Sequence, residues 1–404
     1  MKKLVMLGGA QSQIPAIKKA RDMGCYIIMC DATEEAPGKK YAHEYYNVCT
    51  TNREAVLHLA KCLQADGIVS YAADSGVLTA AYVAEKLGLP SHPYNSVEIV
   101  TNKELFRKFQ RAHSFHIPKA EGYSSFEQAK ADFHRFSLPV IIKPVDSSGS
   151  KGISKIDSLD HLEEKVKVAL RFSKSKRFII EEYIESYGPH IGGDGFSVNG
   201  QLVFRSFSNE YFSTNCSNPF VSIIATWPSI IPERLQNKIH GEIQRMLELL
   251  EMKTGAYNFD IRVDQHENIY LIEMAARNGG DWNPDLIHYV TGVDLIEYTI
   301  KAALGEDCAS LKMAKPHGYW ASYVLHSEKE GVFKDVKIAE ELKKNVVQSQ
   351  LTVKLDERIC PSPNGHVYLG LMILKFSSMK EMKEKTKRLP EQIKAVVEDA
   401  NIKC

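Results

Sequence analysis

A lysine followed closely by a loop of serines and glycines is the first group in this chain that could do chemistry. Lys143 ends an apolar segment, VIIKP, and the loop from Ser147 to Gly152 follows after three residues. Backbone amides of such a loop can surround phosphate oxygens, because glycine permits close approach and positive φ angles. The neighbouring lysine adds the point charge that a triphosphate requires. The pattern predicts phosphate binding, although a flexible surface loop has the same composition.

Two acidic residues fall on segments that predict paired strands. Asp260 lies in AYNFDIRVD and Glu273 in IYLIEM, and a turn at QHEN joins the two segments. We therefore expect the two carboxylates on adjacent strands. Together with phosphate oxygens and water, they would make a suitable octahedral set for Mg²⁺. The alternative is a pair of solvated carboxylates on exposed strand positions.

The elements that must position these residues divide the chain into three parts. Strand and helix patterns alternate over residues 1–93, which predicts βαβ units on a doubly wound parallel sheet. Residues 94–314 mix helices with strands, and residues 315–404 predict a small α+β cap. In the second part we expect one helix from about residue 95 to Pro118 and a hairpin at Asn199-Gly200. The predicted class is α/β.

The glycine-rich turn after the first strand raises the alternative of a dinucleotide site. Gly8 and Gly9 follow the first strand, and Asp31 ends the second. The GxGxxG spacing is absent, however, and topology alone places Asp31 there. A tight turn that faces a substrate is the better interpretation.

Composition narrows the classes of function. The chain has 51 basic and 50 acidic residues, and no run of Lys or Arg is interleaved with aromatic residues as a nucleic-acid groove would require. No apolar run approaches the ~18 residues of a membrane span or resembles a signal sequence. The eight cysteines show no metal-ligand spacing, which predicts reduced thiols. We expect a cytoplasmic protein without nucleic-acid or membrane partners.

In chain order, these motifs resemble those of the ATP-grasp superfamily. Lys103 lies in TNKELF about forty residues before Lys143, FIIEEYI follows about forty residues after it, and Asp260 and Glu273 are thirteen residues apart. The resemblance covers about residues 1–310. It is greatest to the L-amino-acid ligases, phosphoribosylglycinamide ligases, biotin carboxylase and the large subunit of carbamoyl-phosphate synthetase. The segment RNGGDW and the cap most resemble the amino-acid ligases.

The resemblance implies a fold and an activity. The fold is a Rossmann-like pre-ATP-grasp domain, an ATP-grasp domain of two α+β subdomains with a lid at about residues 119–177, and the cap. The activity is an ATP-dependent carboxylate-amine ligase that works through an acyl phosphate and releases ADP and phosphate. Its cofactors would be ATP and Mg²⁺, with Mn²⁺ as the other candidate ion. Its partners would be a small carboxylate, such as an amino acid, and an amine, and many relatives are homodimers.

Other activities on the same fold stay open. A purine-pathway enzyme of the phosphoribosylglycinamide ligase or formyltransferase type is one alternative. A small-molecule kinase and a nucleotide-binding module without turnover are two more.

The resemblance also assigns roles to individual residues. Asp260 and Glu273 would hold the metal ion, and Arg277 would act on the acyl phosphate with Lys143 as the second catalytic residue. Asp74, Arg277, Asn278 and Gly279 would contact the substrates. The residues implied in ATP binding are Lys103, Lys143, Ser147, Ser148, Gly149, Ser150, Gly152, Glu181, Glu182, Tyr183, Ile184 and His190.

Several of these roles have plainer alternatives. Ala275 stands where the family commonly has an asparagine ligand, which puts the coordination of a second metal ion in doubt. Asp74 could be a helix N-cap, His190 a solvent-facing turn residue, and Arg277 part of a surface salt bridge. The polar and aromatic stretch 209–227 is expected to help select the substrates, and ordinary packing explains it nearly as well.

Overall fold

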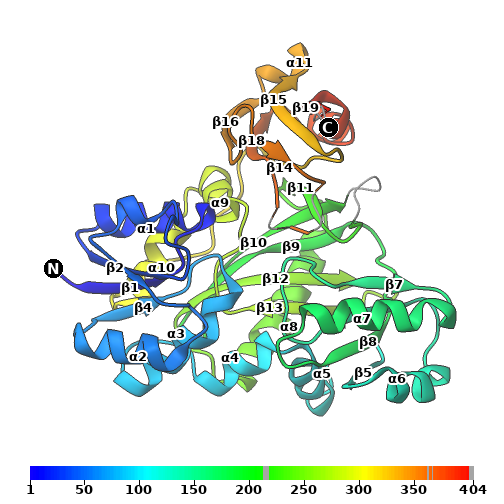
Figure 1. Cartoon of the computed structure of the whole chain (residues 1–404), viewed down its shortest axis with the longest axis horizontal. Coiled ribbons are helices and arrows are strands. Elements are labelled where there is room, and N and C mark those ends of the chain that lie inside the picture. The colour runs from blue at the N-terminus through cyan, green and yellow to red at the C-terminus, as the bar shows by residue number, and fades with distance from the viewer. Residues whose placement is uncertain (213–217, 362–363, 366, 400–404) are drawn as a thin grey trace, which may run out of the picture.

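The computed structural model describes residues 1–212, 218–361, 364–365 and 367–399. Its N-terminal part is a four-stranded parallel sheet in the order β3-β2-β1-β4 (Figure 1). This arrangement confirms the predicted doubly wound sheet. The strands are β1 (Lys3–Leu7), β2 (Tyr26–Asp31), β3 (Glu44–Asn47) and β4 (Gly67–Val69), and the helices that follow them are α1 (Ile14–Asp22), α2 (Arg53–Cys62) and α3 (Asp74–Leu87).

The central strand of this sheet is buried on both faces, as expected when helices cover both sides of a parallel sheet. Leu4 and Met6 of β1 pack in one apolar cluster with α1, whereas Val5 and Leu7 pack in another with α2 and α3. The first cluster also contains Ile300 from α10 (Leu295–Ala303), which belongs to a much later segment. The N-terminal sheet is therefore completed by a helix of the second part.

The predicted single helix near residue 95 is wrong, because two helices occupy the segment. They are α4 (Tyr94–Thr101) and α5 (Lys103–Ala112). Between them Asn102 is extended, and its side chain accepts hydrogen bonds from the backbone N–H groups of Glu104 and Leu105. Asn102 thus caps a new helix, and this cap places Lys103 on its first turn.

A small antiparallel sheet in the order β5-β8-β6-β7 follows. Helices α6 (Phe126–Asp132) and α7 (Leu162–Phe172) contribute Ala129, Val166 and Ala169 to its apolar core. The serine- and glycine-rich loop joins β6 to β7. The strands are β5 (Ala120–Tyr123), β6 (Val140–Pro144), β7 (Ser154–Ile156) and β8 (Phe178–Glu182).

The largest sheet has eight strands in the order β13-β12-β9-β10-β11-β14-β18-β16. The hairpin between β9 and β10 turns at Asn199 and Gly200, with φ angles of 50° and 83°, as predicted. Helix α8 (Glu233–Leu249) covers one face through Ile239, Ile243 and Met246. The strands are β9 (His190–Val198), β10 (Gln201–Phe212), β11 (Ser222–Trp227), β12 (Gly255–Val263), β13 (Ile269–Ala275), β14 (Tyr319–Leu325), β16 (Val346–Leu351) and β18 (Gly370–Phe376).

The C-terminal segment is therefore not separate from the second part, because β14, β18 and β16 continue its large sheet. A second, three-stranded sheet is formed by β17 (Arg358–Ile359), β15 (Gly331–Ile338) and β19 (Ile393–Glu398). Short helices α11 (Glu340–Lys343), α12 (Met379–Thr386) and α13 (Leu389–Gln392) complete it, and α9 (Asn283–Thr291) precedes α10.

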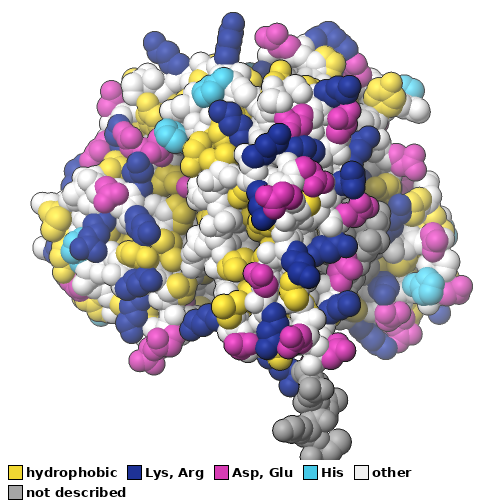
Figure 2. Space-filling view, turned by 90° about the horizontal axis from the view of Figure 1, so that it is seen from above, with side chains coloured by type: hydrophobic (Ala, Val, Ile, Leu, Met, Phe, Trp, Pro, Cys, Tyr) yellow, Lys and Arg dark blue, Asp and Glu magenta, His cyan; other side chains and the backbone are white. Residues whose placement is uncertain are grey.

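The surface mixes charges of both signs. Figure 2 shows basic and acidic side chains interspersed over one face, in keeping with the near-neutral composition. Among the helices of the described ranges, none has both the length and the apolar character that crossing a bilayer requires.

Asp285, in the first turn of α9, provides a test of pH-dependent stability. Burial raises its pKa from 3.8 to about 6, and its Oδ2 atom has no hydrogen-bond partner among the described residues. The folded chain thus keeps a proton that the unfolded chain releases, so stability present below pH 3.8 is lost as the pH rises to about 6.

The side chain of Asn in Asp285→Asn stays neutral at every pH, so this variant should not lose stability as the pH rises to about 6. We expect it to raise the free energy of unfolding by about 1 to 2 kcal/mol at ~pH 7.5 and to change it little at ~pH 4. Urea unfolding at both pH values measures the difference. An equal effect at the two pH values would contradict the assignment.

Candidate active site

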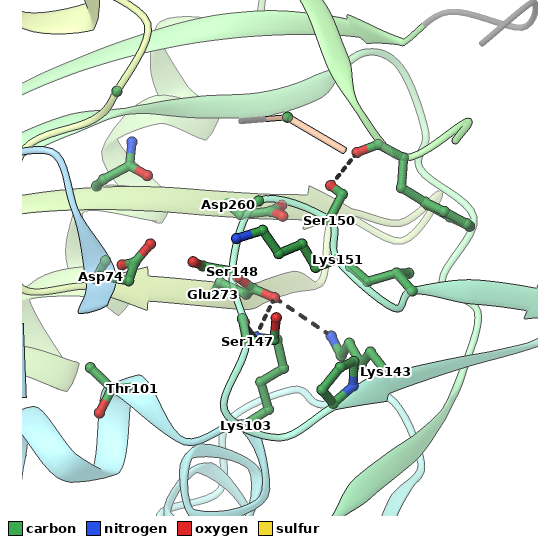
Figure 3. Close-up of a pocket in the computed structure, with 18 of the residues that line it drawn as sticks. Asp74, Thr101, Lys103, Lys143, Ser147, Ser148, Ser150, Lys151, Asp260 and Glu273 are labelled. Atoms are coloured by element: carbon green, nitrogen blue, oxygen red, sulfur yellow. Dashed lines mark hydrogen bonds and ion pairs between the residues drawn. The ribbon is translucent and has the colours of Figure 1, made fainter. Parts of the chain in front are cut away.

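A cavity of about 1540 Å³ lies where the N-terminal part, the small sheet and the large sheet meet (Figure 3). The C-terminal segment also contributes to its wall, through Thr352, Gly365 and Tyr368. The predicted site residues that line it are Asp74, Lys103, Lys143, Ser147, Ser148, Gly149, Ser150, Glu181, Glu182, Tyr183, Ile184, His190, Asp260, Glu273 and Arg277.

Three predicted residues do not line the cavity. Gly152 is buried in a turn with a φ angle of 73°. Asn278 has no exposed surface, and its Oδ1 accepts a hydrogen bond from Thr299. The Gly279 N–H donates to the buried carboxylate of Asp194. Direct substrate contact by Asn278 and Gly279 does not agree with this geometry, because both lie behind the cavity wall.

Two lysines converge on the carboxylate of Glu273. Lys103 Nζ lies 3.3 Å from Glu273 Oε1 and donates to the Ser147 carbonyl at 2.7 Å. Lys143 Nζ lies 3.9 Å from the same Glu273 oxygen. Figure 3 shows both ammonium groups turned toward Glu273 from opposite elements, α5 and β6. Two positive charges are therefore held beside one carboxylate on the cavity wall.

Glu181 balances these charges from the interior. Its side chain is 4% exposed, and its Oε2 lies 2.8 Å from Lys143 Nζ, whereas its Oε1 lies 2.8 Å from Arg107 Nε. Burial opposes ionisation, but the two cations outweigh it and lower the pKa of Glu181 to about 2. The Glu182 side chain instead accepts the Ser137 N–H. Neither carboxylate points freely into the cavity.

The glycine loop is held in a folded conformation. Gly149 and Ser150 have φ angles of 63° and 59°, a region that favours glycine. Ser150 Oγ donates to the Phe220 carbonyl at 2.7 Å, and Asn218 Nδ2 donates to the Ser150 carbonyl at 2.9 Å. The Gly365 N–H donates to the Gly149 carbonyl at 3.1 Å. The loop is therefore anchored to the segment after β10 and to the C-terminal segment.

Asp260 and Glu273 are register partners on β12 and β13. Asp260 Oδ1 lies 2.6 Å from Nε2 of His190, which is a strand residue with a 9% exposed side chain. The solvent-facing turn alternative for His190 is therefore wrong. Burial favours the neutral imidazole, but Asp260 outweighs it and raises the pKa of His190. Burial likewise opposes ionisation of Asp260, yet His190 lowers the pKa of Asp260 to about 2.

The two carboxylates fit a magnesium ion that is shared with a nucleotide. No group of three or more His, Cys, Asp or Glu side chains in the described ranges could hold a metal ion by itself. Mg²⁺ commonly takes one or two carboxylates and completes its shell with substrate phosphates and water. Ala275 has Asn258 as its register partner, so an amide does lie beside it. That amide is engaged with Asp194 and Arg277.

Arg277 and Asp74 form a two-pronged ion pair across the cavity wall. Arg277 Nε and Nη2 donate to the two Asp74 oxygens at 2.9 and 2.7 Å, and Nη1 donates to Asn258 and to the Asn278 carbonyl. Ala73 occupies the cap position of α3, and Asp74 is its first residue, so the N-cap alternative is wrong. The pair links the N-terminal part to the large sheet.

Sequence reasoning missed two further acidic residues that line the same cavity, Glu210 and Asp281, which form an acidic lobe. Burial raises the pKa of Glu210 to about 7 and that of Asp281 to about 6. Glu210 lies over Gly192, where a Cβ atom would collide with its carboxylate. Glu210, Phe212, Phe220, Val221 and Ser222 of the predicted selecting stretch line the cavity, and its residues 213–217 lie outside the described residues.

Comparisons with known proteins agree with this geometry. Residues 136–285 match the family model described as the ATP-grasp domain. The chain thus carries an ATP-grasp domain, which confirms the resemblance predicted from its motifs.

Relatives and solved structures extend the match. The chain is 27% identical over 187 residues to a formate-dependent phosphoribosylglycinamide formyltransferase of Methanocaldococcus jannaschii, a match that covers 45% of this chain and 48% of that protein. It spans about half the length of the curated relatives that it matches. An L-amino acid ligase of Bacillus licheniformis has a similar fold, with a TM-score of 0.82, 20% identity and 99% of each chain covered. A phosphoribosylglycinamide synthetase of Anaerococcus prevotii has a TM-score of 0.77 at 19% identity, with 98% of this chain and 100% of that chain covered.

Proposed function

We propose that this protein is an ATP-dependent ligase that joins a small carboxylate, such as an amino acid, to an amine and releases ADP and phosphate. The observation that carries the proposal is the convergence of Lys103, Lys143, Asp260 and Glu273 on one wall of the cavity. Two cations beside two carboxylates suit a metal-bound polyphosphate. The ligases among the similar structures support the same activity.

Lys103 and Lys143 would hold the phosphates of ATP. Both ammonium groups form ion pairs with Glu273, which compensates their charge. A Mg²⁺ ion between Asp260 and Glu273 would supply charge neutralisation for the phosphates when bound. The lysines would then exchange the carboxylate of Glu273 for phosphate oxygens. Catalysis of phosphoryl transfer rests on such positioning and electrostatic stabilisation.

The loop from Ser147 to Gly152 would close over the transferred phosphate. An acyl phosphate that meets water hydrolyses, so the site must exclude water until the amine attacks. The hydrogen bond from the Gly365 N–H to the Gly149 carbonyl supports covering of the loop by the C-terminal segment. We propose residues 119–177 as the lid and expect its closure to depend on ATP.

The remaining cavity wall would receive the acid and the amine. Arg277 offers a guanidinium for charge that develops on the acyl phosphate. The acidic lobe of Glu210 and Asp281 would favour a positively charged amino group over a second anion. An amino acid substrate fits this arrangement, since it presents a carboxylate and an ammonium group at once.

The test is release of ADP and phosphate from ATP and Mg²⁺ across pools of amino acids and small carboxylates, with mass spectrometry of the products. Substrate-dependent ADP, free phosphate and a condensed product would establish the ligase. Hydroxylamine should trap the acyl phosphate as a hydroxamate. AMP with pyrophosphate, a stable phosphorylated product, or no turnover would instead indicate adenylation, a kinase or a binding module.

A further inference from the structure

Arg107 is among the largest fully buried side chains, with 2% of its surface exposed. It lies on α5 one turn after Lys103, so both side chains leave the same face of the helix. A buried guanidinium is costly unless its charge and its donors are satisfied. The ion-pair and hydrogen-bond partners of Arg107 therefore indicate which elements it holds in place.

The charge of Arg107 is satisfied by Glu181, the carboxylate that also holds Lys143. The two ion pairs are both 2.8 Å long, and together they form a chain from Arg107 through Glu181 to Lys143. Glu181 lies on β8 and is the register partner of Ile141 on β6, the strand that carries Lys143. The chain is almost fully excluded from solvent, with side chains 2 to 4% exposed. Little water screens it, so its geometry is strongly constrained.

The two terminal nitrogens of Arg107 have partners on α5 and on the strand that carries Glu273. Nη1 donates to Oε1 of Gln110 at 2.7 Å. Nη1 also contacts the carbonyl of Leu271 at 3.4 Å, and Nη2 donates to the carbonyl of Ile272 at 2.8 Å. These are the two residues before Glu273 on β13. Arg107 thus joins the small sheet, which carries a phosphate lysine, to the large sheet, which carries a metal carboxylate.

We propose that Arg107 is a positioning residue for nucleotide binding, which sets Lys143 through Glu181 and is itself held against β13 by the carbonyls of that strand. The inference rests on the proposed function, since it takes Lys143 as a phosphate ligand. Arg107 does not line the cavity and would touch no substrate atom. The planar guanidinium group is required, because it pairs with a carboxylate and contacts two backbone carbonyls at the same time.

The test compares MgADP affinity, measured by calorimetry, for Arg107→Lys, Lys143→Met and the double variant. Arg107→Lys keeps the charge but loses the planar guanidinium group, and we expect it to weaken MgADP binding by about 10- to 100-fold, as loss of outer-shell partners does at metal sites. If Arg107 acts through Lys143, the double variant binds no more weakly than the worse single variant, within about twofold. If the two effects multiply, Arg107 does not act through Lys143 and the inference is overturned.

One further variant provides a second test of the inference, and another serves as a control. Glu181→Gln should show the same non-additivity with Lys143→Met, which provides a second measurement if Arg107→Lys folds poorly. Arg177→Lys is the matched control, because Arg177 pairs with Glu104 of α5 at 2.8 and 2.9 Å, whereas the described ion pairs of Glu181 and Glu273 are with Arg107, Lys103 and Lys143. It should change MgADP affinity by less than about twofold. An unchanged affinity in Lys143→Met alone would instead overturn the proposed function.

Discussion

Glu273→Ala should lower kcat for ADP release by about three orders of magnitude, since on the proposed function it would remove a ligand of the metal ion that offsets phosphate charge in the transition state. The side chain is 39% exposed and its ion pairs are with the two cavity lysines. It is not part of any apolar core cluster, so the fold should persist. Turnover with saturating ATP and Mg²⁺ measures the loss, and the thermal midpoint checks the fold.

Glu267→Ala is the matched control for this prediction. Glu267 lies at the turn of the same hairpin and pairs with Arg234, outside the cavity. It should leave kcat unchanged within about twofold. If the turnover of Glu273→Ala stays close to that of the unmodified protein, Glu273 is not a metal ligand. The proposed phosphoryl transfer at this site would then be wrong.

The positions of the proposed phosphate-binding elements in the fold could be predicted because their signals are local. Lys143, the glycine loop and the β12–β13 hairpin each depend on a few adjacent residues whose order survives folding. The hairpin pattern therefore predicted that Asp260 and Glu273 would lie on adjacent strands, and the structure makes them register partners. The resemblance of the motifs then supplied the fold, which no single motif could have supplied.

The contacts that complete the site depend on distant pairings that sequence patterns do not encode. Arg107 looked like an ordinary helix residue, and only the fold brings it to Glu181 and to the carbonyls of β13. In the sequence, Glu210 is one polar residue within a predicted strand. Only the register of β9 and β10 places its carboxylate over Gly192. Similarly, the extension of the large sheet by β14, β18 and β16 has no local signature.

Arg277→Met should lower kcat by about 10²- to 10³-fold, because a guanidinium aimed at developing oxyanion charge contributes that much in comparable sites. Two of its three nitrogens, however, donate to Asp74. Arg277 must therefore break at least one of its two hydrogen bonds to Asp74 before it can reach an acyl phosphate. Substrate binding and separation of this ion pair should be coupled.

Asp74→Asn separates this gated role from a purely mechanical clamp. The variant keeps the shape of the side chain but removes the charge that holds Arg277. If the substrate amine displaces Arg277 from Asp74, Asp74→Asn should raise KM for the amine about tenfold while kcat changes far less, since Asp74 would contribute to amine binding and Arg277 to the transition state. If the pair only clamps the N-terminal part to the large sheet, Asp74→Asn and Arg277→Met should lower kcat equally, and the double variant should be no worse than either. Initial rates over a grid of amine concentrations distinguish the two cases, because a catalytic arginine and a clamp predict opposite divisions of the loss between KM and kcat.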